Sequence, residues 1–274
     1  MNQNDIKFLV LDIDGTLTNS NKMISPATKA GILRVMENGH KVILASGRPT
    51  AGMIKCAEEL EFDKRGGYLL SFNGGCILEY RSGNILFQKT LPPHIIKGLY
   101  RFATEHDCGL ITYLDRNIIA GTRLDEYIEL EARINGMEIR CVDNFVNFVD
   151  FDVNKYLMTA PPEVAEKYAE QLQERYKDEL SVYRSEPFFI EIMPKGIDKA
   201  KSLDRMMNIV GLTKDNCICC GDGYNDMTMI RYAGVGVAME NAQPQVKEVA
   251  DFITDSNDND GIVKVIDTFI LPKE

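Results

Sequence analysis

An apolar run that ends in two carboxylates, near the start of the sequence, constrains the fold more than any other stretch. Residues 8–11 are all apolar, and Asp12, Ile13, Asp14 and Gly15 follow them. A continuous apolar run is typical of a strand that is buried on both faces in a parallel sheet. Asp12 and Asp14 lie two residues apart and point to the same face. At the end of a parallel strand, that places both acids where open α/β sheets bind ligands.

Two neighbouring carboxylates repel each other unless a cation lies between them or one of them holds a proton. The pair of Asp12 and Asp14 therefore indicates a cation site or an acid–base site at the strand end. The alternative interpretation is a strand that ends in an Asx turn, with both acids solvated.

A strand-then-helix alternation runs from the start of the chain to about residue 75 and returns after residue 194. Ser25 and Pro26 have the residue types of a helix start, a capping serine followed by proline at the first helical position. Continuous apolar strands that alternate with helices predict a parallel sheet with right-handed crossovers, which is an α/β, Rossmann-like fold. The expected strands are 6–12, 41–46, 68–71, 217–220, 235–239 and 252–254, and the last helix is expected at 261–270.

The pattern changes between these two parts. Helical stretches near 93–106, 124–135 and 162–177 alternate with strand-like stretches near 110–121, 138–142, 154–159, 181–184 and 188–193. Mixed hairpins and helices are typical of an α+β unit. We therefore predict a discontinuous core domain, residues 1–83 and 194–274, with a second domain inserted at 84–193.

Charge and composition narrow the classes of partner. The chain has 274 residues and a net charge of −10, which argues against a nucleic-acid backbone as a partner. No apolar run approaches the roughly 18 residues of a membrane span, and the first residues do not have the pattern of a signal peptide. Seven cysteines without framework spacing predict reduced thiols and a cytoplasmic protein. We expect a small-molecule partner and a monomer or weak homodimer.

Polar residues gather at four predicted strand ends or helix starts. Parallel neighbours would bring the strand ends together at one edge of the sheet. Several carboxylates without cysteine or histidine form a hard-oxygen site, which suits Mg²⁺ better than zinc. The three histidines lie outside the four clusters, so imidazole catalysis has no candidate there. The clusters are Asp12 and Asp14; Ser46, Gly47 and Arg48; Lys195 or Lys199; and Asp222, Asn225 and Asp226.

This set of residue types suits phosphoryl transfer. A carboxylate can act as a covalent nucleophile towards phosphorus, and a second one can protonate the leaving oxygen and then activate water. Mg²⁺, a lysine ammonium and a helix start with free N–H groups would neutralise the phosphoryl group. Competing nucleotide motifs fail, because no Gly-x4-Gly-Lys-Ser/Thr is present and residues 221–223 lack the third glycine of a dinucleotide site.

At this point four motifs resemble those of the haloacid dehalogenase (HAD) superfamily of phosphotransferases. Residues 12–17 resemble its first motif, 46–48 its second, Lys199 its third and 221–226 its fourth. Residues 73–75 and 191–199 are similar to the Cof-type branch, which carries a large α/β cap between the second and third motifs. The resemblance covers the whole chain and implies a Rossmann-like core with an inserted cap domain.

The resemblance also implies roles by position. Asp12 would be the nucleophile that becomes an aspartyl-phosphate, and Asp14 would be the general acid and base. Mg²⁺ would be held by Asp12, the Asp14 carbonyl and Asp222, with Asp226 in support. Ser46, Gly47, Lys199 and Asn225 would hold the phosphate, while Arg48 and Asn73 would face the substrate entrance.

These roles predict a Mg²⁺-dependent phosphatase of small phosphorylated metabolites, sugar phosphates first among them. An Asp at position 14 fits phosphatases, whereas dehalogenases of the superfamily lack that acid. Two alternatives remain, a phosphomutase of the same superfamily and a non-catalytic regulator that binds a phosphate ligand.

Several residues also keep a simpler interpretation. Lys195 lies four residues before Lys199, and the register of the motif favours Lys199. Arg48 is also a candidate for a structural salt bridge, and Asp226 for an acid favoured by a helix N-terminus alone. Residues 255–260 are acidic and polar, and are expected to form a solvated loop.

Overall fold

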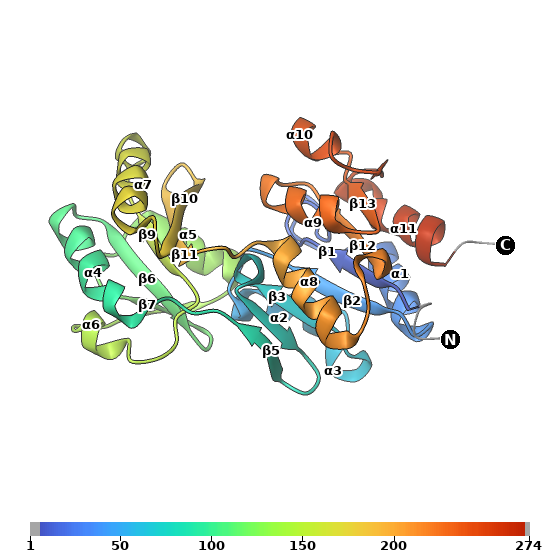
Figure 1. Cartoon of the computed structure of the whole chain (residues 1–274), viewed down its shortest axis with the longest axis horizontal. Coiled ribbons are helices and arrows are strands. Elements are labelled where there is room, and N and C mark those ends of the chain that lie inside the picture. Colours follow the sequence, from blue (N-terminus) through green and yellow to red (C-terminus); the bar gives the residue numbers. More distant parts are fainter. Residues whose placement is uncertain (1–5, 272–274) are drawn as a thin grey trace. The chain divides into compact units, whose positions relative to one another are not determined.

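The computed structural model describes residues 6–271 and divides into two compact units. The core unit consists of the chain up to Phe87 and from Asp198 onward, and the cap unit is Gln88–Ile197 (Figure 1). Both junctions lie a few residues later than the expected 84–193. The reason is that strand β5 (Asn84–Gln88) continues the sheet of the core unit, while β11 (Phe189–Pro194) still belongs to the sheet of the cap unit.

The core unit is built on an eight-stranded sheet with the order β14-β13-β12-β1-β2-β3-β4-β5. Strand β1 lies in its middle and pairs in parallel with β12 and β2. All four residues of β1 are buried, as a continuous apolar run predicts. Besides β5, the strands of this sheet are β1 (Phe8–Leu11), β2 (Lys41–Ala45), β3 (Tyr68–Ser71), β4 (Cys76–Glu79), β12 (Cys217–Gly221), β13 (Val235–Ala238) and β14 (Phe252–Ile253).

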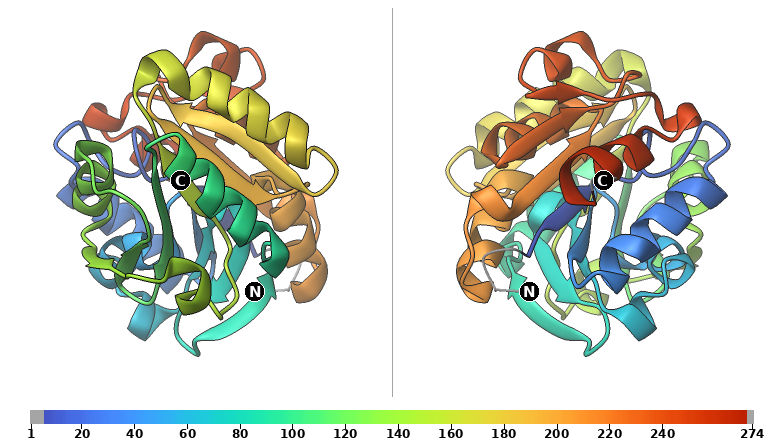
Figure 2. Two further views of the ribbon diagram at one scale, coloured as in Figure 1. Left: turned by 90° about the vertical axis from the view of Figure 1, so that its left-hand side faces the viewer. Right: turned by 90° about the vertical axis from the view of Figure 1, so that its right-hand side faces the viewer.

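Helices cover both faces of this sheet. The connection from β1 to β2 and the connection from β12 to β13 run in opposite directions from the sheet centre, so right-handed crossovers place their helices on opposite faces. Accordingly α1 packs beside α11 and α8 packs beside α9 (Figure 2). The helices are α1 (Pro26–Glu37), α2 (Thr50–Glu59), α3 (Phe62–Arg65), α8 (Lys199–Val210), α9 (Met227–Tyr232), α10 (Pro244–Lys247) and α11 (Gly261–Val265).

The helix boundaries follow local chemistry. Ser25 accepts a hydrogen bond from the Thr28 amide at 3.0 Å and Pro26 begins α1, as predicted. Asp198 caps α8 in the same way, and Gly211 ends that helix at a φ of +71°. The helix expected at 261–270 is only partly correct, because α-helical geometry ends at Val265 and a π-helical turn covers Ile266–Ile270.

The cap unit has a six-stranded sheet with the order β10-β11-β9-β6-β7-β8. Its pairs are antiparallel except for β7 with β8, which confirms the α+β character expected for the insertion. The predicted hairpin at 110–121 is present as β6 and β7. The elements are β6 (Gly109–Leu114), β7 (Asn117–Ala120), β8 (Glu138–Cys141), β9 (Tyr156–Thr159), β10 (Leu180–Glu186), and α4 (Ile96–Glu105), α5 (Glu126–Asn135), α6 (Phe145–Phe148) and α7 (Pro162–Tyr176).

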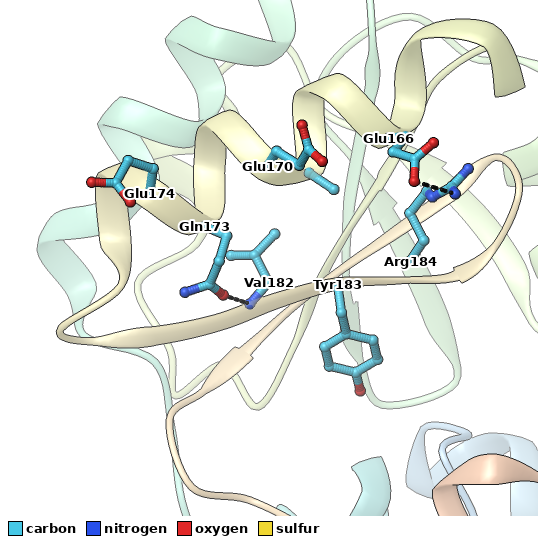
Figure 3. A pocket seen from close by; sticks show the side chains of 8 residues that line it. Glu166, Glu170, Gln173, Glu174, Val182, Tyr183 and Arg184 are labelled. Carbon is cyan, nitrogen blue, oxygen red and sulfur yellow. Dashed lines mark hydrogen bonds and ion pairs between the residues drawn. The ribbon is translucent and has the colours of Figure 1, made fainter.

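A shallow hollow of about 350 Å³ lies between α7 and the edge strand β10 (Figure 3). Gln173 accepts a hydrogen bond from the Val182 amide at 2.7 Å, and Glu166 pairs with Arg184 at 3.3 Å. The edge of β10 is thus shielded by a helix and by a side chain, which protects it against pairing with another strand. None of the predicted site residues lines this hollow.

Across residues 6–271, the structure contains no helix with the length and apolar character needed to cross a bilayer.

Leu172 of α7 offers a test of the packing in the cap unit. Its side chain is fully buried in the apolar cluster of that unit, and α7 lies against β10 and β11. Leu172→Ala should lower the free energy of unfolding by about 2–5 kcal/mol because it leaves a cavity. Urea unfolding followed by circular dichroism measures this change. Glu170→Ala, at an exposed position of the same helix, is the matched control; an equal effect of the two substitutions would contradict this packing.

Candidate active site

The predicted polar clusters of the core unit meet at the carboxyl edge of its sheet. Leu11 pairs with Leu44 of β2 and with Cys220 of β12, so the three strands end at the same level. Asp12 then follows β1 directly, Ser46 follows β2 and Asp222 follows β12. Parallel pairing of adjacent strands is therefore what brings residues so distant in sequence together.

The ammonium of Lys199 connects three of these segments. Its Nζ donates to Asp12 Oδ1 at 2.7 Å, to the Ala45 carbonyl at 2.8 Å and to Asp226 Oδ1 at 2.5 Å. The Lys199 side chain is 0% exposed, and the two carboxylates raise its pKa against the effect of burial. The register of the motif favoured Lys199 over Lys195, and the structure places Lys199 beside Asp12 and Asp226. Lys195 is exposed, and its Nζ donates to the Lys177 carbonyl at 2.8 Å within the cap unit.

Asp226 shapes the loop that follows β12. Its Oδ2 accepts hydrogen bonds from the amides of Asp222 at 3.0 Å and Gly223 at 2.9 Å, while its Oδ1 faces Lys199. Gly221 has no room for a side chain, because a Cβ there would lie 2.4 Å from the Cβ of Asp226. Both oxygens of Asp226 thus have donors in the protein, so the acid does more than face a helix N-terminus.

Asp222 contacts the turn that follows β1. Thr16 Oγ1 donates to Asp222 Oδ1 at 2.8 Å. Gly15 has a φ of +84°, and a Cβ there would lie 2.4 Å from Asp222 Oδ2. Glycine is required at this position by both the backbone conformation and the close approach of the carboxylate.

Asp14 has two cationic partners. Arg48 binds it in bidentate fashion, with Nε 2.7 Å from Oδ2 and Nη2 2.8 Å from Oδ1, and Lys22 Nζ lies 2.9 Å from Oδ1. Burial alone would raise the pKa of Asp14, but the hydrogen bonds and the charge of Arg48 outweigh it and lower that pKa. The salt bridge considered for Arg48 is therefore present, and it lies inside the candidate site.

The remaining predicted residues surround this centre. Ser46 Oγ accepts a hydrogen bond from the Arg48 amide at 3.2 Å. Asn225 Nδ2 donates to Asn73 Oδ1 at 3.1 Å, and a Cβ on Gly47 would come within 3.3 Å of the Asn73 amide group. All ten predicted site residues belong to the core unit.

Three of the acids form a group that fits a divalent cation. Carboxylate oxygens of Asp12, Asp222 and Asp226 all lie within 4.8 Å of one another. Burial, and then the charge of Asp226, raises the pKa of Asp12 to about 8, and burial raises the pKa of Asp222 to about 6. One ammonium thus leaves this cluster with excess negative charge. Oxygen ligands of this kind suit Mg²⁺.

Sequence reasoning missed Lys22, Thr16 and Asn241. Thr16 lies within the first motif, so the sequence did contain a feature that could have marked it as a site residue. Lys22 and Asn241 had none, because Lys22 reaches Asp14 through a turn at a φ of +59° and Asn241 contacts Gly15 across 226 residues of sequence.

The whole chain is similar to known proteins. It is 31% identical to the 5-amino-6-(5-phospho-D-ribitylamino)uracil phosphatase YcsE of Bacillus subtilis, with 97% of each chain covered. A haloacid dehalogenase-like hydrolase from Bacteroides thetaiotaomicron has a TM-score of 0.93 at 40% identity, covering 96% of this chain and 98% of that one. The structure of a HAD subclass IIB sugar phosphatase has a TM-score of 0.82 at 25% identity, covering 97% and 99%.

These comparisons confirm the predicted fold class and the predicted enzyme class, a HAD-type phosphatase. The family model of haloacid dehalogenase-like hydrolases matches residues 9–266, which span every motif described above. The chain belongs to the haloacid dehalogenase-like hydrolase family.

Proposed function

We propose that the protein is a Mg²⁺-dependent phosphatase of small phosphorylated metabolites, sugar phosphates first among them, and that it works through an aspartyl-phosphate on Asp12. The observation that carries this proposal is the pair of acids at the end of β1 in opposite electrostatic settings. Asp12 lies among carboxylates beside Lys199, and Asp14 lies between Arg48 and Lys22. Two carboxylates whose environments push their pKa values apart are suited to different chemical roles.

The proposed reaction has two steps. A carboxylate oxygen of Asp12 attacks phosphorus, and the bond from phosphorus to the leaving oxygen breaks while Asp14 gives that oxygen a proton. Asp14 then takes a proton from water, whose oxygen attacks the phosphorus and releases inorganic phosphate from Asp12. At the end of the two steps Asp12 is again a free carboxylate and Asp14 again holds the proton that it gave in the first step.

Asp14 is paired with Arg48 before substrate arrives, and this pairing favours its ionised form. To donate a proton, Asp14 first has to take one up from solvent, and for this it has to leave the guanidinium. We propose that the leaving group of the substrate separates them. That would place Arg48 at the substrate entrance, as expected from the motif.

The metal would be held by Asp12, the Asp14 carbonyl and Asp222. When bound, Mg²⁺ supplies positive charge that neutralises the phosphoryl oxygens. Asp226 has both oxygens engaged by Lys199 and by loop amides, which favours a supporting role for it. Ser46, the Gly47 amide, Lys199 and Asn225 would hold the phosphate, and Asn73 would lie beside Asn225 at the entrance.

The substrate class is inferred from what the chain resembles. Its relatives include a phosphatase of a phosphoribityl compound and a sugar phosphatase, both of which are named for small phosphate esters with polyhydroxylated carbon chains. We propose the same class of partner here. The cytoplasmic location expected from the cysteine usage stays a prediction, as does the monomeric or weakly dimeric state.

Asp12→Asn tests the covalent mechanism. An amide cannot accept the phosphoryl group, so this variant should lose essentially all Mg²⁺-dependent phosphate release from an aryl phosphate and from a panel of sugar, nucleotide and cofactor phosphates. Circular dichroism and a melting curve would establish that the variant is folded. Turnover that survives in a folded Asp12→Asn protein would overturn the aspartyl-phosphate.

A product assay separates hydrolysis from its alternatives. Release of inorganic phosphate from a sugar phosphate, unchanged by a bisphosphate primer, supports the phosphatase. An isomeric sugar phosphate formed only with the primer would identify a phosphomutase. Mg²⁺ binding without turnover of any ester would indicate a regulator instead.

Lys199→Met should abolish turnover and also weaken the fold. It leaves Asp12 and Asp226 buried without their shared cation, and the loss of one partner of a buried pair costs about 3–5 kcal/mol. Activity and urea unfolding measure the two effects. Lys195→Met, at the exposed lysine four residues earlier, is the control and should change neither; comparable losses in both variants would argue against a special role of Lys199.

Mg²⁺ binding should strengthen as the pH rises from 5 to 8. Without metal, the raised pKa values of Asp12 (about 8) and Asp222 (about 6) mean that protons compete with the cation at low pH. The Mg²⁺ concentration that gives half of the maximal thermal stabilisation should therefore fall about tenfold or more over this range. Asp222→Asn should flatten the dependence. A half-saturating concentration that does not change with pH would contradict the metal site.

A further inference from the structure

Four side chains from the last part of the chain hold the segment that follows Asp14. We propose that they are positioning residues for the reaction, a role that rests on the proposed function. We call Asn241, Asn257, Asp258 and Asp260 the clamp, and residues 15–25 the clamped segment.

Two asparagines of the clamp bind the backbone of the clamped segment. Asn241 Nδ2 donates to the Gly15 carbonyl at 2.8 Å, and Asn257 Nδ2 donates to the Thr18 carbonyl at 2.9 Å. The Asn257 amide also donates to Asn241 Oδ1 at 3.0 Å. The backbone of Asn257 thus orients the side-chain amide that Asn241 presents to Gly15, while the Asn257 side chain separately holds Thr18.

The two acids of the clamp bind residues further along the chain from Gly15 and Thr18. Asp258 accepts hydrogen bonds from the Ser20 amide at 2.8 Å and the Ser20 hydroxyl at 2.6 Å. Asp260 accepts from the hydroxyls of Ser25 and Thr28. Residues 255–260 are exposed or half-buried, as expected of a solvated loop, but they also make contacts that the expectation did not include. The loop is polar because its side chains serve as partners for a segment more than 200 residues earlier in the sequence.

The clamped segment contacts both halves of the candidate site. Lys22 binds Asp14, and Thr16 binds Asp222. Gly15 adjoins Asp14 and has a φ of +84°. As a glycine it has no side chain that could hold the backbone in this conformation. The bond from Asn241 fixes the peptide that follows this glycine, and so limits how the Asp14–Gly15 turn can rotate.

The clamp bonds are exposed or only partly buried, and Asn241 itself is exposed. A hydrogen bond in water stabilises a fold only modestly. A small displacement of reacting groups, by contrast, can lower a rate on the order of a hundredfold. The clamp should therefore affect turnover far more than stability.

Asn241→Ala and Asn257→Ala test this inference, with Asn259→Ala as the matched control. Asn259 lies in the same loop, and its side-chain Nδ2 donates to Ser256 Oγ at 2.9 Å within that loop. In the two clamp variants, kcat for an aryl phosphate should fall about tenfold or more while KM and Tm stay close to wild type. The Mg²⁺ concentration for half-maximal thermal stabilisation should rise. The control should match wild type in all four measurements.

Asn241→Asp separates the hydrogen bond from the loss of a side chain. This variant keeps an acceptor for the Asn257 amide but has no donor for the Gly15 carbonyl, so it should lose as much kcat as Asn241→Ala. Wild-type kcat in Asn241→Asp would overturn the inference. So would equal losses in all three alanine variants, or a clamp effect seen only as a lower Tm.

Failure of the proposed function gives a different result. Wild-type protein that releases no phosphate with Mg²⁺ would overturn the phosphatase. The clamp would then be judged on Mg²⁺ affinity alone, from the thermal shift. An affinity unchanged by Asn241→Ala and Asn257→Ala would overturn the clamp as well, and a weaker one would support it.

Discussion

The buried ammonium of Lys199 is the interaction on which the candidate site depends. Asp12 follows β1 and Asp226 lies in the loop between β12 and α9, where burial and mutual repulsion disfavour two negative charges. Lys199 donates to both, and to the Ala45 carbonyl of β2, so that one side chain ties together three segments that the sheet brings side by side. The N-cap at Asp198 and the packing of α8 hold the lysine in place, which links the helix start directly to the chemistry.

The two acids after β1 differ because their surroundings differ. Asp12 shares one buried cation with Asp226 and lies close to Asp222, and its pKa is raised. Asp14, two residues later, is paired with Arg48 and Lys22, and its pKa is lowered. A bound metal ion would lower the pKa of Asp12. The pKa of Asp14 would instead change when substrate separates it from Arg48. The proposed nucleophile and the proposed acid–base group therefore depend on two separate events, metal binding and substrate binding.

The sequence predicted the strand ends well because continuous apolar runs followed by polar clusters are local features. Asp12, Ser46 and Asp222 meet where parallel pairing requires them to, and the four ordered motifs identified the family before any geometry was known. The lysine choice also followed from motif register. Lys22, Asn241 and the loop at 255–260 were beyond such reasoning, because their partners depend on positive-φ turns and on contacts across more than 200 residues.

The division of the chain has a chemical consequence. Every residue with a proposed role in bond making, from Asp12 to Asp226, belongs to the core unit, and the cap unit of Gln88–Ile197 contributes none of them. A site of this kind can keep its reaction while the inserted unit changes, since function depends on the site and not on the rest of the fold. The buried charges of the core restrict substitution there. Selection among phosphate esters is therefore expected to depend on the residues of the cap unit, where the sequence carries the least motif detail.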